Sequence, residues 1–325
     1  MRLHGKALRG TLHKAGFGTR GLVLLRDGEG AKTVREWERT IRAMAKAALD
    51  RSSFVIAFGG GSIGDAAGFA AATYMRGIRL IQIPTTLLAM VDSSVGGKTG
   101  LNLLEGKNLV GSFHQPSLVL ADLAFLGTLP SKQRQSGVYE ILKCGLLRSE
   151  ALVKLIERTG GLQRASDIDL ETAIASAVRV KARIVERDER ESGERILLNL
   201  GHTLGHALEA ATAYRLFTHG EAVGYGMEFA VDLGERLGVT KVRSAQRMRA
   251  AIKAVGRRTP LRLSMAEAAQ RATLGDKKRR GPWLSEVLLS GPQEPIVHRA
   301  EARAFANAVL EWISQMATPA PPGRG

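Results

Sequence analysis

Three of the seven histidines in this 325-residue chain fall within one short window. Asn199-Leu-Gly-His-Thr-Leu-Gly-His-Ala-Leu-Glu209 is followed by His219-Gly-Glu-Ala-Val. His202 and His206 are four residues apart, so on a helix they share one face. Such a face can present two imidazoles to a metal ion, or one to a metal and one to a substrate. His219 begins another apolar run, and two converging helix starts would build a polar pocket. Surface or capping roles are the alternative.

Glycines follow an apolar run earlier in the chain. Ser53–Phe58 has the composition of a buried strand, and Gly59-Gly60-Gly61-Ser62-Ile63-Gly64-Asp65 leads from it into a small-residue run with helical spacing. Glycines let a backbone approach a phosphate, and a helix N-terminus offers N–H groups to it. The segment differs from the GxGxxG fingerprint, so a plain tight turn is the alternative. Thr85 and Thr86 follow the next predicted strand, so their hydroxyls would face the same sheet edge.

The glycine-rich segment from Val91 to Gly100 is similar to a phosphate-binding loop of ATPases. The first glycine of that motif would be residue 92, where this sequence has Asp92, so the ATPase interpretation fails. An acid and Lys98 in a glycine-rich loop still suit a polar, anionic ligand. Lys107 and Asn108 add a cation and an amide.

Charged residues precede the histidine window. Glu140 and Lys143 are three apart and would share a helix face, either as a surface ion pair or as part of a site. Lys181, Glu191 and Arg195 follow in order. By themselves Lys181 and Glu191 would pass as a solvated helix face.

The pattern of apolar residues predicts two domains. Residues 1–130 alternate predicted strands and helices, which indicates an α/β domain with a parallel sheet. Residues 131–316 contain long amphipathic runs, among them Ile196–Thr212, and only Glu286–Leu289 has the composition of a strand. This predicts a mainly helical second domain. The Pro/Gly-rich residues 317–325 are predicted to be a disordered tail.

Composition excludes several classes of protein. The net charge is +16, but the basic residues are scattered and no nucleic-acid motif accompanies them, so nucleic acid is not an expected partner. No apolar stretch is long enough to cross a bilayer, and the N-terminus lacks a signal-peptide core, so no membrane partner is expected. Cys144 is the single cysteine, which excludes an intrachain disulfide and favours the cytoplasm.

Taken together, these motifs resemble the 3-dehydroquinate synthase branch of the sugar-phosphate cyclase family. The GGGxxGDxxGF, PTT, VDSSVGGKTG, GKN, TLP, ExxK and NxGHTxGHxxE…HGEAV patterns occur in the family's order, between Asp27 and about Gly291. The resemblance implies a Rossmann-like N-terminal domain that binds NAD+, a helical C-terminal domain, and a divalent metal, Zn²⁺ or Co²⁺, between them. Met1–Leu8 already resembles the helix that follows the family's first strand, so this strand has no expected counterpart.

The resemblance also assigns roles to individual residues. The implied metal ligands are Glu140, His202 and His219. The implied NAD+ site consists of Asp27, Gly28, Glu29, Lys32, Gly60, Gly61, Ser62, Ile63, Gly64, Asp65, Thr85, Thr86, Lys98, Lys107 and Thr128. The implied catalytic residues are Asp92, Lys98, Glu191, Arg195, Asn199 and His206, and the other substrate-binding residues are Arg76, Asn108, Lys143, Lys181 and Lys278, with Lys277 the alternative to Lys278.

The activity implied is conversion of 3-deoxy-D-arabino-heptulosonate 7-phosphate, a sugar phosphate of the shikimate pathway, to 3-dehydroquinate and phosphate. Lys181, Arg195 and Asn199 are the family positions that suit a substrate with a carboxylate. This favours that activity over valiolone- or inosose-type cyclases. A polyol dehydrogenase and a truncated, inactive paralogue are further alternatives. Arg76 resembles the residue that reaches the substrate of a neighbouring subunit, which implies a homodimer.

Overall fold

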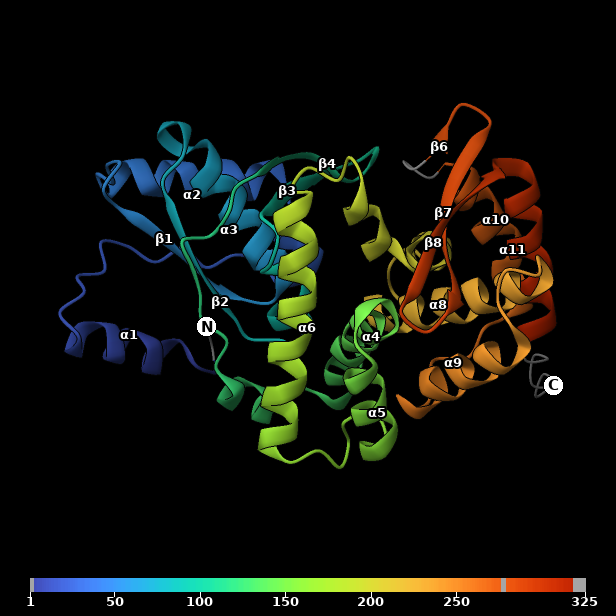
Figure 1. Ribbon diagram of the computed structural model, residues 1–325. Coiled ribbons are helices and arrows are strands. Elements are labelled where there is room, and N and C mark those ends of the chain that lie inside the picture. The colour runs from blue at the N-terminus through green and yellow to red at the C-terminus, as the bar shows by residue number, and fades with distance from the viewer. Residues whose placement is uncertain (1–2, 276–278, 318–325) are drawn as a thin grey trace, which may run out of the picture. The chain divides into compact units, whose positions relative to one another are not determined.

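The computed structural model describes residues 3–275 and 279–317. The chain forms two compact units, residues 1–130 and 131–325. Figure 1 shows strands and helices in the first unit and mostly helices in the second. The predicted tail lies, from residue 318 on, outside the described residues, as do Lys277 and Lys278. Within the described residues, no helix is long and apolar enough to cross a membrane.

The first unit is built on a parallel sheet with strand order β1-β2-β5. Gly59 at the end of β1 is paired with Pro84 at the end of β2, so the loops that follow both strands leave the same sheet edge. The apolar run at Leu22–Leu25 forms no strand. The elements are α1 (Gly5–Lys14), η1 (Gly28–Ala31), α2 (Val34–Lys46), β1 (Phe54–Gly59), α3 (Gly61–Thr73), η2 (Tyr74–Arg76), β2 (Arg79–Pro84), η3 (Ala89–Ser93), β3 (Lys98–Leu103), β4 (Gly106–Phe113), β5 (Leu118–Val119) and η4 (Leu123–Thr128).

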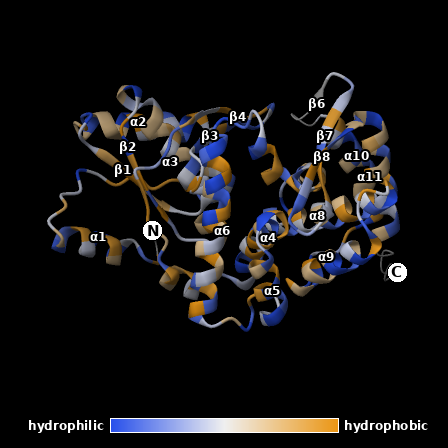
Figure 2. Cartoon of the chain, viewed as in Figure 1, coloured by the Kyte–Doolittle hydropathy of each residue, from blue (hydrophilic) through white to orange (hydrophobic). Residues whose placement is uncertain are grey.

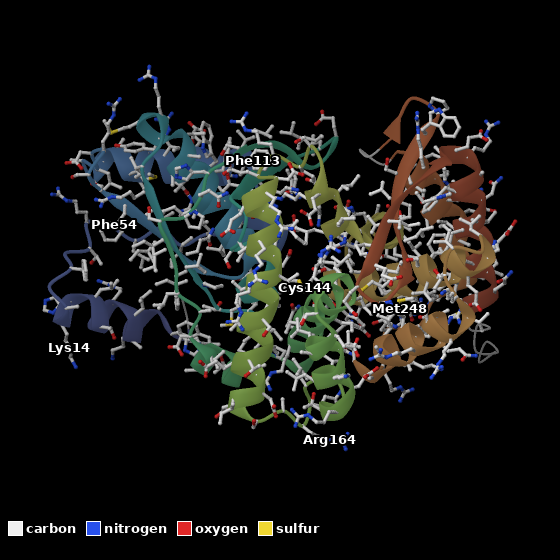
Figure 3. The ribbon with its side chains drawn as sticks, viewed as in Figure 1. Lys14, Phe54, Phe113, Cys144, Arg164 and Met248 are labelled. Atoms are coloured by element: carbon white, nitrogen blue, oxygen red, sulfur yellow. The ribbon has the colours of Figure 1, made fainter. Side chains whose placement is uncertain are left out.

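Apolar side chains hold α2 and α3 to this sheet. Ala57 of β1, Leu80 of β2 and Ala70 of α3 are buried in one cluster with Met44 of α2. Figure 2 shows β1 and β2 as hydrophobic strands, as expected for a parallel sheet with covered faces. In Figure 3, Phe54 marks the start of β1 and Phe113 the end of β4, the second strand of an antiparallel hairpin with β3.

The second unit is mainly helical, as predicted. Its elements are α4 (Ser131–Arg148), α5 (Glu150–Thr159), α6 (Asp167–Arg187), η5 (Glu194–Asn199), α7 (His202–Ala211), α8 (His219–Arg236), α9 (Val242–Ala254), η6 (Leu263–Met265), α10 (Ala266–Leu274), β6 (Arg279–Arg280), β7 (Trp283–Gly291), β8 (Glu294–Glu301) and α11 (Ala302–Met316). The prediction of a single strand there was wrong, because β6, β7 and β8 form an antiparallel sheet.

The run Ile196–Thr212 is not one helix. It divides into η5 and α7, because Gly201 takes a left-handed conformation with φ of 76°. A side chain at this position would also collide with the backbone of α8, since a Cβ would lie 2.6 Å from the nitrogen of Met227. The break allows α7 to begin at His202, close against α8.

Candidate metal and substrate site

Three helices of the second unit bring Glu140, His202 and His219 together. Nε2 of His202 and Nε2 of His219 each lie 3.8 Å from Oε1 of Glu140. The two imidazole ring centroids are 5.2 Å apart. Within the part of the chain that the structure describes, the three residues form one of two groups with the spacing needed to hold a metal ion.

The geometry fits a divalent metal. Separations of 3.8 Å are too long for hydrogen bonds, but they are near the roughly 3.4 Å between ligands in a tetrahedral zinc site. The side chain of Glu140 is 1% exposed, and among the described residues Oε1 has no hydrogen-bond partner. A buried anionic oxygen without a donor is costly unless a cation meets it. One carboxylate and two imidazoles also form the donor set of catalytic zinc sites.

Local structure explains how the histidines are aimed. His202 is the first residue of α7, and its Nδ1 lies 3.1 Å from the carbonyl oxygen of Leu200, a contact that suits Nε2 as the ligating atom. His219 is the first residue of α8, which begins with a capping box between Thr218 and Glu221. Both histidines therefore stand at helix starts, which was predicted for His219 but not for His202, which was expected inside the run Ile196–Thr212.

A glycine places α8 directly against the helix that carries Glu140. A Cβ on Gly220 would lie 2.0 Å from the carbonyl oxygen of Ser136. Ser136 precedes Glu140 by one helical turn, so this close approach sets the distance between Glu140 and His219. The backbone nitrogen of Gly220 also donates to Oγ of Ser136 at 2.9 Å, which strengthens the same junction.

Glu209 belongs to the site but was not assigned a role from the sequence. Its Oε2 lies 3.3 Å from Nδ1 of His219. With His206 and His219 it makes the second group of possible metal ligands. The group that contains Glu140 fits a metal ion better, because His206 is exposed whereas Glu140 supplies the buried, unsatisfied oxygen. The GHxxE spacing, which puts Glu209 one turn after His206, was the available signal.

Cationic side chains lie in the same unit. Lys143 forms an ion pair with Glu140, and both side chains are buried, so the pair is not a surface ion pair. Figure 3 marks Cys144, the next residue of α4. Lys181 of α6 and Arg195 of η5 are 7% and 2% exposed. His206 shares a face of α7 with His202, and their ring centroids are 5.4 Å apart. A polar, positively charged surrounding of this kind suits an anionic ligand.

The segment before the histidines is a short loop followed by η5. Glu191 adopts φ of 59°, and its Oε1 accepts a hydrogen bond of 2.6 Å from Nδ2 of Asn199. The guanidinium of Arg195 donates to the backbone oxygen of Glu189. The structure thus brings Glu191 and Asn199 into direct contact.

The first unit brings together several residues of the predicted NAD+ site. Nζ of Lys32 lies 2.6 Å from Oδ2 of Asp65 and also donates to Oδ1 of Asn108. Burial raises the pKa of Asp65, and the charge of Lys32 opposes this rise. Lys107 pairs with Glu29 at 3.4 Å. Lys32 is 3% exposed, so it acts as the fixed centre of this cluster.

The glycine turn and the Pro-Thr-Thr segment lie side by side. The backbone nitrogen of Thr85 donates to the carbonyl oxygen of Gly59 at 2.9 Å. α3 begins at Gly61 with Gly60 as its N-cap. A Cβ on Gly61 would lie 2.6 Å from Oγ of Ser93, so a side chain there would force Ser93 to move. A helix N-terminus with this open backbone suits a phosphate group.

The remaining predicted residues of the first unit are spread over other elements. Asp27 is the N-cap of η1, Asp92 lies in η3 and Lys98 begins β3. Thr128 forms a hydrogen bond of 2.8 Å with His4. Arg76 is exposed at the end of η2. Of the residues predicted to bind NAD+ or substrate in this unit, Lys32 contacts Asp65, from the predicted NAD+ site, and Asn108, from the predicted substrate site.

Comparisons with known proteins point to one family. The model of the 3-dehydroquinate synthase N-terminal domain matches residues 22–136, and the model of the C-terminal domain matches residues 137–279. The chain is 47% identical over 279 residues to a 3-dehydroquinate synthase from Halorhodospira halophila, which covers 85% of this chain and 78% of that protein.

Two solved structures of cyclases are also similar. A 2-epi-5-epi-valiolone synthase from Streptomyces hygroscopicus subsp. jinggangensis, with NAD+ and Zn²⁺ bound, has a TM-score of 0.87 at 28% identity and covers 97% of this chain and 88% of that one. A 2-deoxy-scyllo-inosose synthase complexed with carbaglucose-6-phosphate, NAD+ and Co²⁺ has a TM-score of 0.82 at 27% identity, covering 91% of this chain and 82% of that one.

Proposed function

Because the chain belongs to the 3-dehydroquinate synthase family, we propose that it converts 3-deoxy-D-arabino-heptulosonate 7-phosphate to 3-dehydroquinate and phosphate. The observation that carries the proposal is the 47% identity with a 3-dehydroquinate synthase, against 28% and 27% with the valiolone and inosose synthases. The proposed enzyme is a lyase that eliminates phosphate and closes a carbocyclic ring.

The proposed reaction is redox-neutral overall. When bound, NAD+ would accept and later return the hydride from one carbinol carbon of the sugar ring. A divalent ion held by Glu140, His202 and His219 would polarise the oxygen of that carbinol. The exposed His206 is proposed to move protons during phosphate elimination and ring closure, since an imidazole titrates near neutral pH. Asp92, Lys98, Glu191 and Asn199 are the further groups proposed to meet the substrate.

The NAD+ site is proposed to lie in the first unit. The N-terminus of α3 supports binding of the pyrophosphate, because glycines at Gly60 and Gly61 leave its backbone open. The cluster centred on Lys32 supports binding of the remaining polar groups. The bound NAD+ and Zn²⁺ or Co²⁺ of the two similar cyclases support the same cofactors here.

The substrate is proposed to carry a carboxylate. Lys143, Lys181 and Arg195 are buried cations, and their charge is most useful when an anion reaches them. A sugar 7-phosphate without a carboxylate would not need all three. The specific observation in favour of a valiolone-type activity is the TM-score of 0.87, which makes sedoheptulose 7-phosphate the second substrate to test.

We also propose a homodimer in the cytoplasm. Arg76 follows Met75, and both have positive φ, at 67° and 50°, so this exposed turn is held in one uncommon conformation. A fixed, exposed cation suits a contact with a substrate in a neighbouring subunit. The single cysteine, buried Cys144, fits a reducing compartment. Light scattering of the purified protein measures its molar mass, which should be twice that of one chain.

The test is phosphate release from 3-deoxy-D-arabino-heptulosonate 7-phosphate, with and without added NAD+ and Zn²⁺. We expect release that requires both and no net accumulation of NADH. Parallel assays with sedoheptulose 7-phosphate and glucose 6-phosphate should give no product. Release from either of these alone would assign a different cyclase, and NADH accumulation would assign a dehydrogenase. Absence of turnover with every substrate would contradict an enzymatic function.

A further inference from the structure

The loop between α6 and η5 folds around one carboxylate. Oδ1 of Asp188 accepts hydrogen bonds from the backbone nitrogen and the hydroxyl of Ser192, at 2.9 and 3.1 Å. Oδ2 accepts from the backbone nitrogens of Gly193 and Arg195, at 2.7 and 2.9 Å. A single side chain thereby supplies acceptors for three backbone N–H groups of the loop and of the first turn of η5, where a helix leaves its N–H groups unpaired.

Asp188 remains ionised at every working pH. Burial opposes its ionisation, but the backbone N–H groups of Arg195, Ser192 and Gly193 outweigh burial and hold the pKa at about 2. Hydrogen bonds to a charged acceptor are shorter and stronger than neutral ones. The loop is therefore closed around a permanent anion.

This loop carries the side chains proposed to meet the substrate. Glu191 stands within it in the left-handed region, a conformation that is unfavourable for a residue with a side chain and must be offset by neighbouring contacts. Its carboxylate is held by Asn199, and the backbone nitrogen of Arg195 is held by Asp188. The position of Arg195 thus depends directly on Asp188.

The ion pairs that also hold this loop contribute less than the hydrogen bonds of Asp188. Glu194 pairs with Arg148 and Arg187 at 3.1 and 3.3 Å, and the two arginine side chains are 36% and 65% exposed. Exposed ion pairs contribute little to stability, because water and salt screen them. Asp188, with four hydrogen bonds to neighbouring residues, is the principal constraint on the loop.

We propose that Asp188 is a positioning residue for substrate recognition: it holds Glu191 and Arg195 in the arrangement that receives an anionic substrate. This proposal rests on the proposed function. Its effect is expected in the Michaelis constant, since the loop does not carry the metal ligands Glu140, His202 and His219. The chain offers a matched control on the same helix.

Asp169 is that control. It lies in the first turn of α6, and its carboxylate accepts hydrogen bonds from the backbone nitrogen and hydroxyl of Ser166 and from Arg158. Its pKa is also lowered, by Arg158 and then by Ser166. It is separated from Asp188 by nearly the whole helix, about 30 Å at 1.5 Å per residue. Loss of Asp169 removes a comparable set of bonds far from Arg195.

The experiment compares Asp188→Ala with Asp169→Ala in the full chain. We expect Asp188→Ala to raise KM for the heptulosonate phosphate at least about tenfold, with a smaller fall in kcat and unchanged zinc content, which corresponds to about 1.4 kcal/mol of lost binding. Asp169→Ala should leave KM unchanged. Combined with Arg195→Ala, Asp188→Ala should add little, because both act through one group.

A second readout does not depend on turnover. Hydrogen exchange of the amides from Ser192 to Arg195 should become faster in Asp188→Ala and stay unchanged in Asp169→Ala. Unchanged exchange, or an equal rise of KM in both variants, would overturn the positioning role. If the wild-type protein releases no phosphate, the proposed function fails, and hydrogen exchange alone then decides whether Asp188 orders the loop.

Discussion

Oε2 of Glu209 lies 3.3 Å from Nδ1 of His219, while the other ring nitrogen of His219 lies 3.8 Å from Oε1 of Glu140. One imidazole thus joins two carboxylates. The nitrogen near Glu209 is suited to donate a proton, which fixes the tautomer and leaves Nε2 as a metal ligand. Glu209 therefore orients His219 in the proposed site.

Replacement of Glu209 by Gln should weaken metal binding. The amide keeps the size of the side chain but loses its charge, and losing such an orienting partner typically costs about 10–100-fold in metal affinity. Competition between the protein and a chromophoric zinc chelator measures the affinity. Zinc affinity equal to that of the wild-type protein would show that Glu209 has no role in orienting His219.

Glu140 should matter twice, for the metal and for stability. Glu140→Ala removes one of three ligands, so bound zinc and turnover should be lost. It also removes the carboxylate that pairs with the buried ammonium of Lys143, and breaking a buried pair typically costs about 3–5 kcal/mol. Denaturant unfolding of the metal-free proteins measures this cost. The double variant Glu140→Ala/Lys143→Met should recover most of the stability but no zinc, and full activity of Glu140→Ala with stoichiometric zinc would refute the metal assignment.

Much of the fold and site could be predicted because the signals are local. Ser53–Phe58 predicted β1, and the four-residue spacing of His202 and His206 predicted that they share a helix face. Elements fixed by distant contacts were missed. The break at Gly201 depends on the approach of Met227, a residue far along the chain. The β3–β4 hairpin is short and interrupted by an irregular register between Leu101 and Leu103, so no alternation of apolar residues marks it.

The contacts of single side chains could not be predicted either. Spacing placed Glu140 and Lys143 on one helix face but could not decide between a solvated pair and a buried one, because burial depends on which elements cover α4. Asp188 gave no signal as a possible site residue. Its role arises because the following loop turns back onto the end of α6, and secondary-structure propensities do not predict such a turn.

Gly226 should tolerate no side chain. A Cβ there would lie 1.7 Å from the carbonyl oxygen of Gly201, so α7 and α8 would have to separate. Overpacking typically costs about 1–3 kcal/mol, which lowers Tm by roughly 2–12 °C in a chain of this class. For Gly226→Ala we expect a fall in Tm at the upper end of this range. We also expect the variant to lose zinc, because His202 and His219 begin these two helices. The control is Gly275→Ala, whose Cβ would be 3.5 Å from the nearest atom and should leave Tm within about 2 °C.

Asp188 should also contribute to acid sensitivity. Its pKa is lowered from 3.8 to about 2 in the folded chain, so its stabilising effect is complete above about pH 4 and is lost as the pH falls toward 2. Asp188→Asn has no such group to protonate. The difference in unfolding free energy between the wild-type protein and Asp188→Asn should therefore be constant from pH 5 to 8 and shrink between pH 4 and 2. Urea unfolding at each pH measures it, and a difference that stays constant to pH 2 would mean that the carboxylate is not held as an anion.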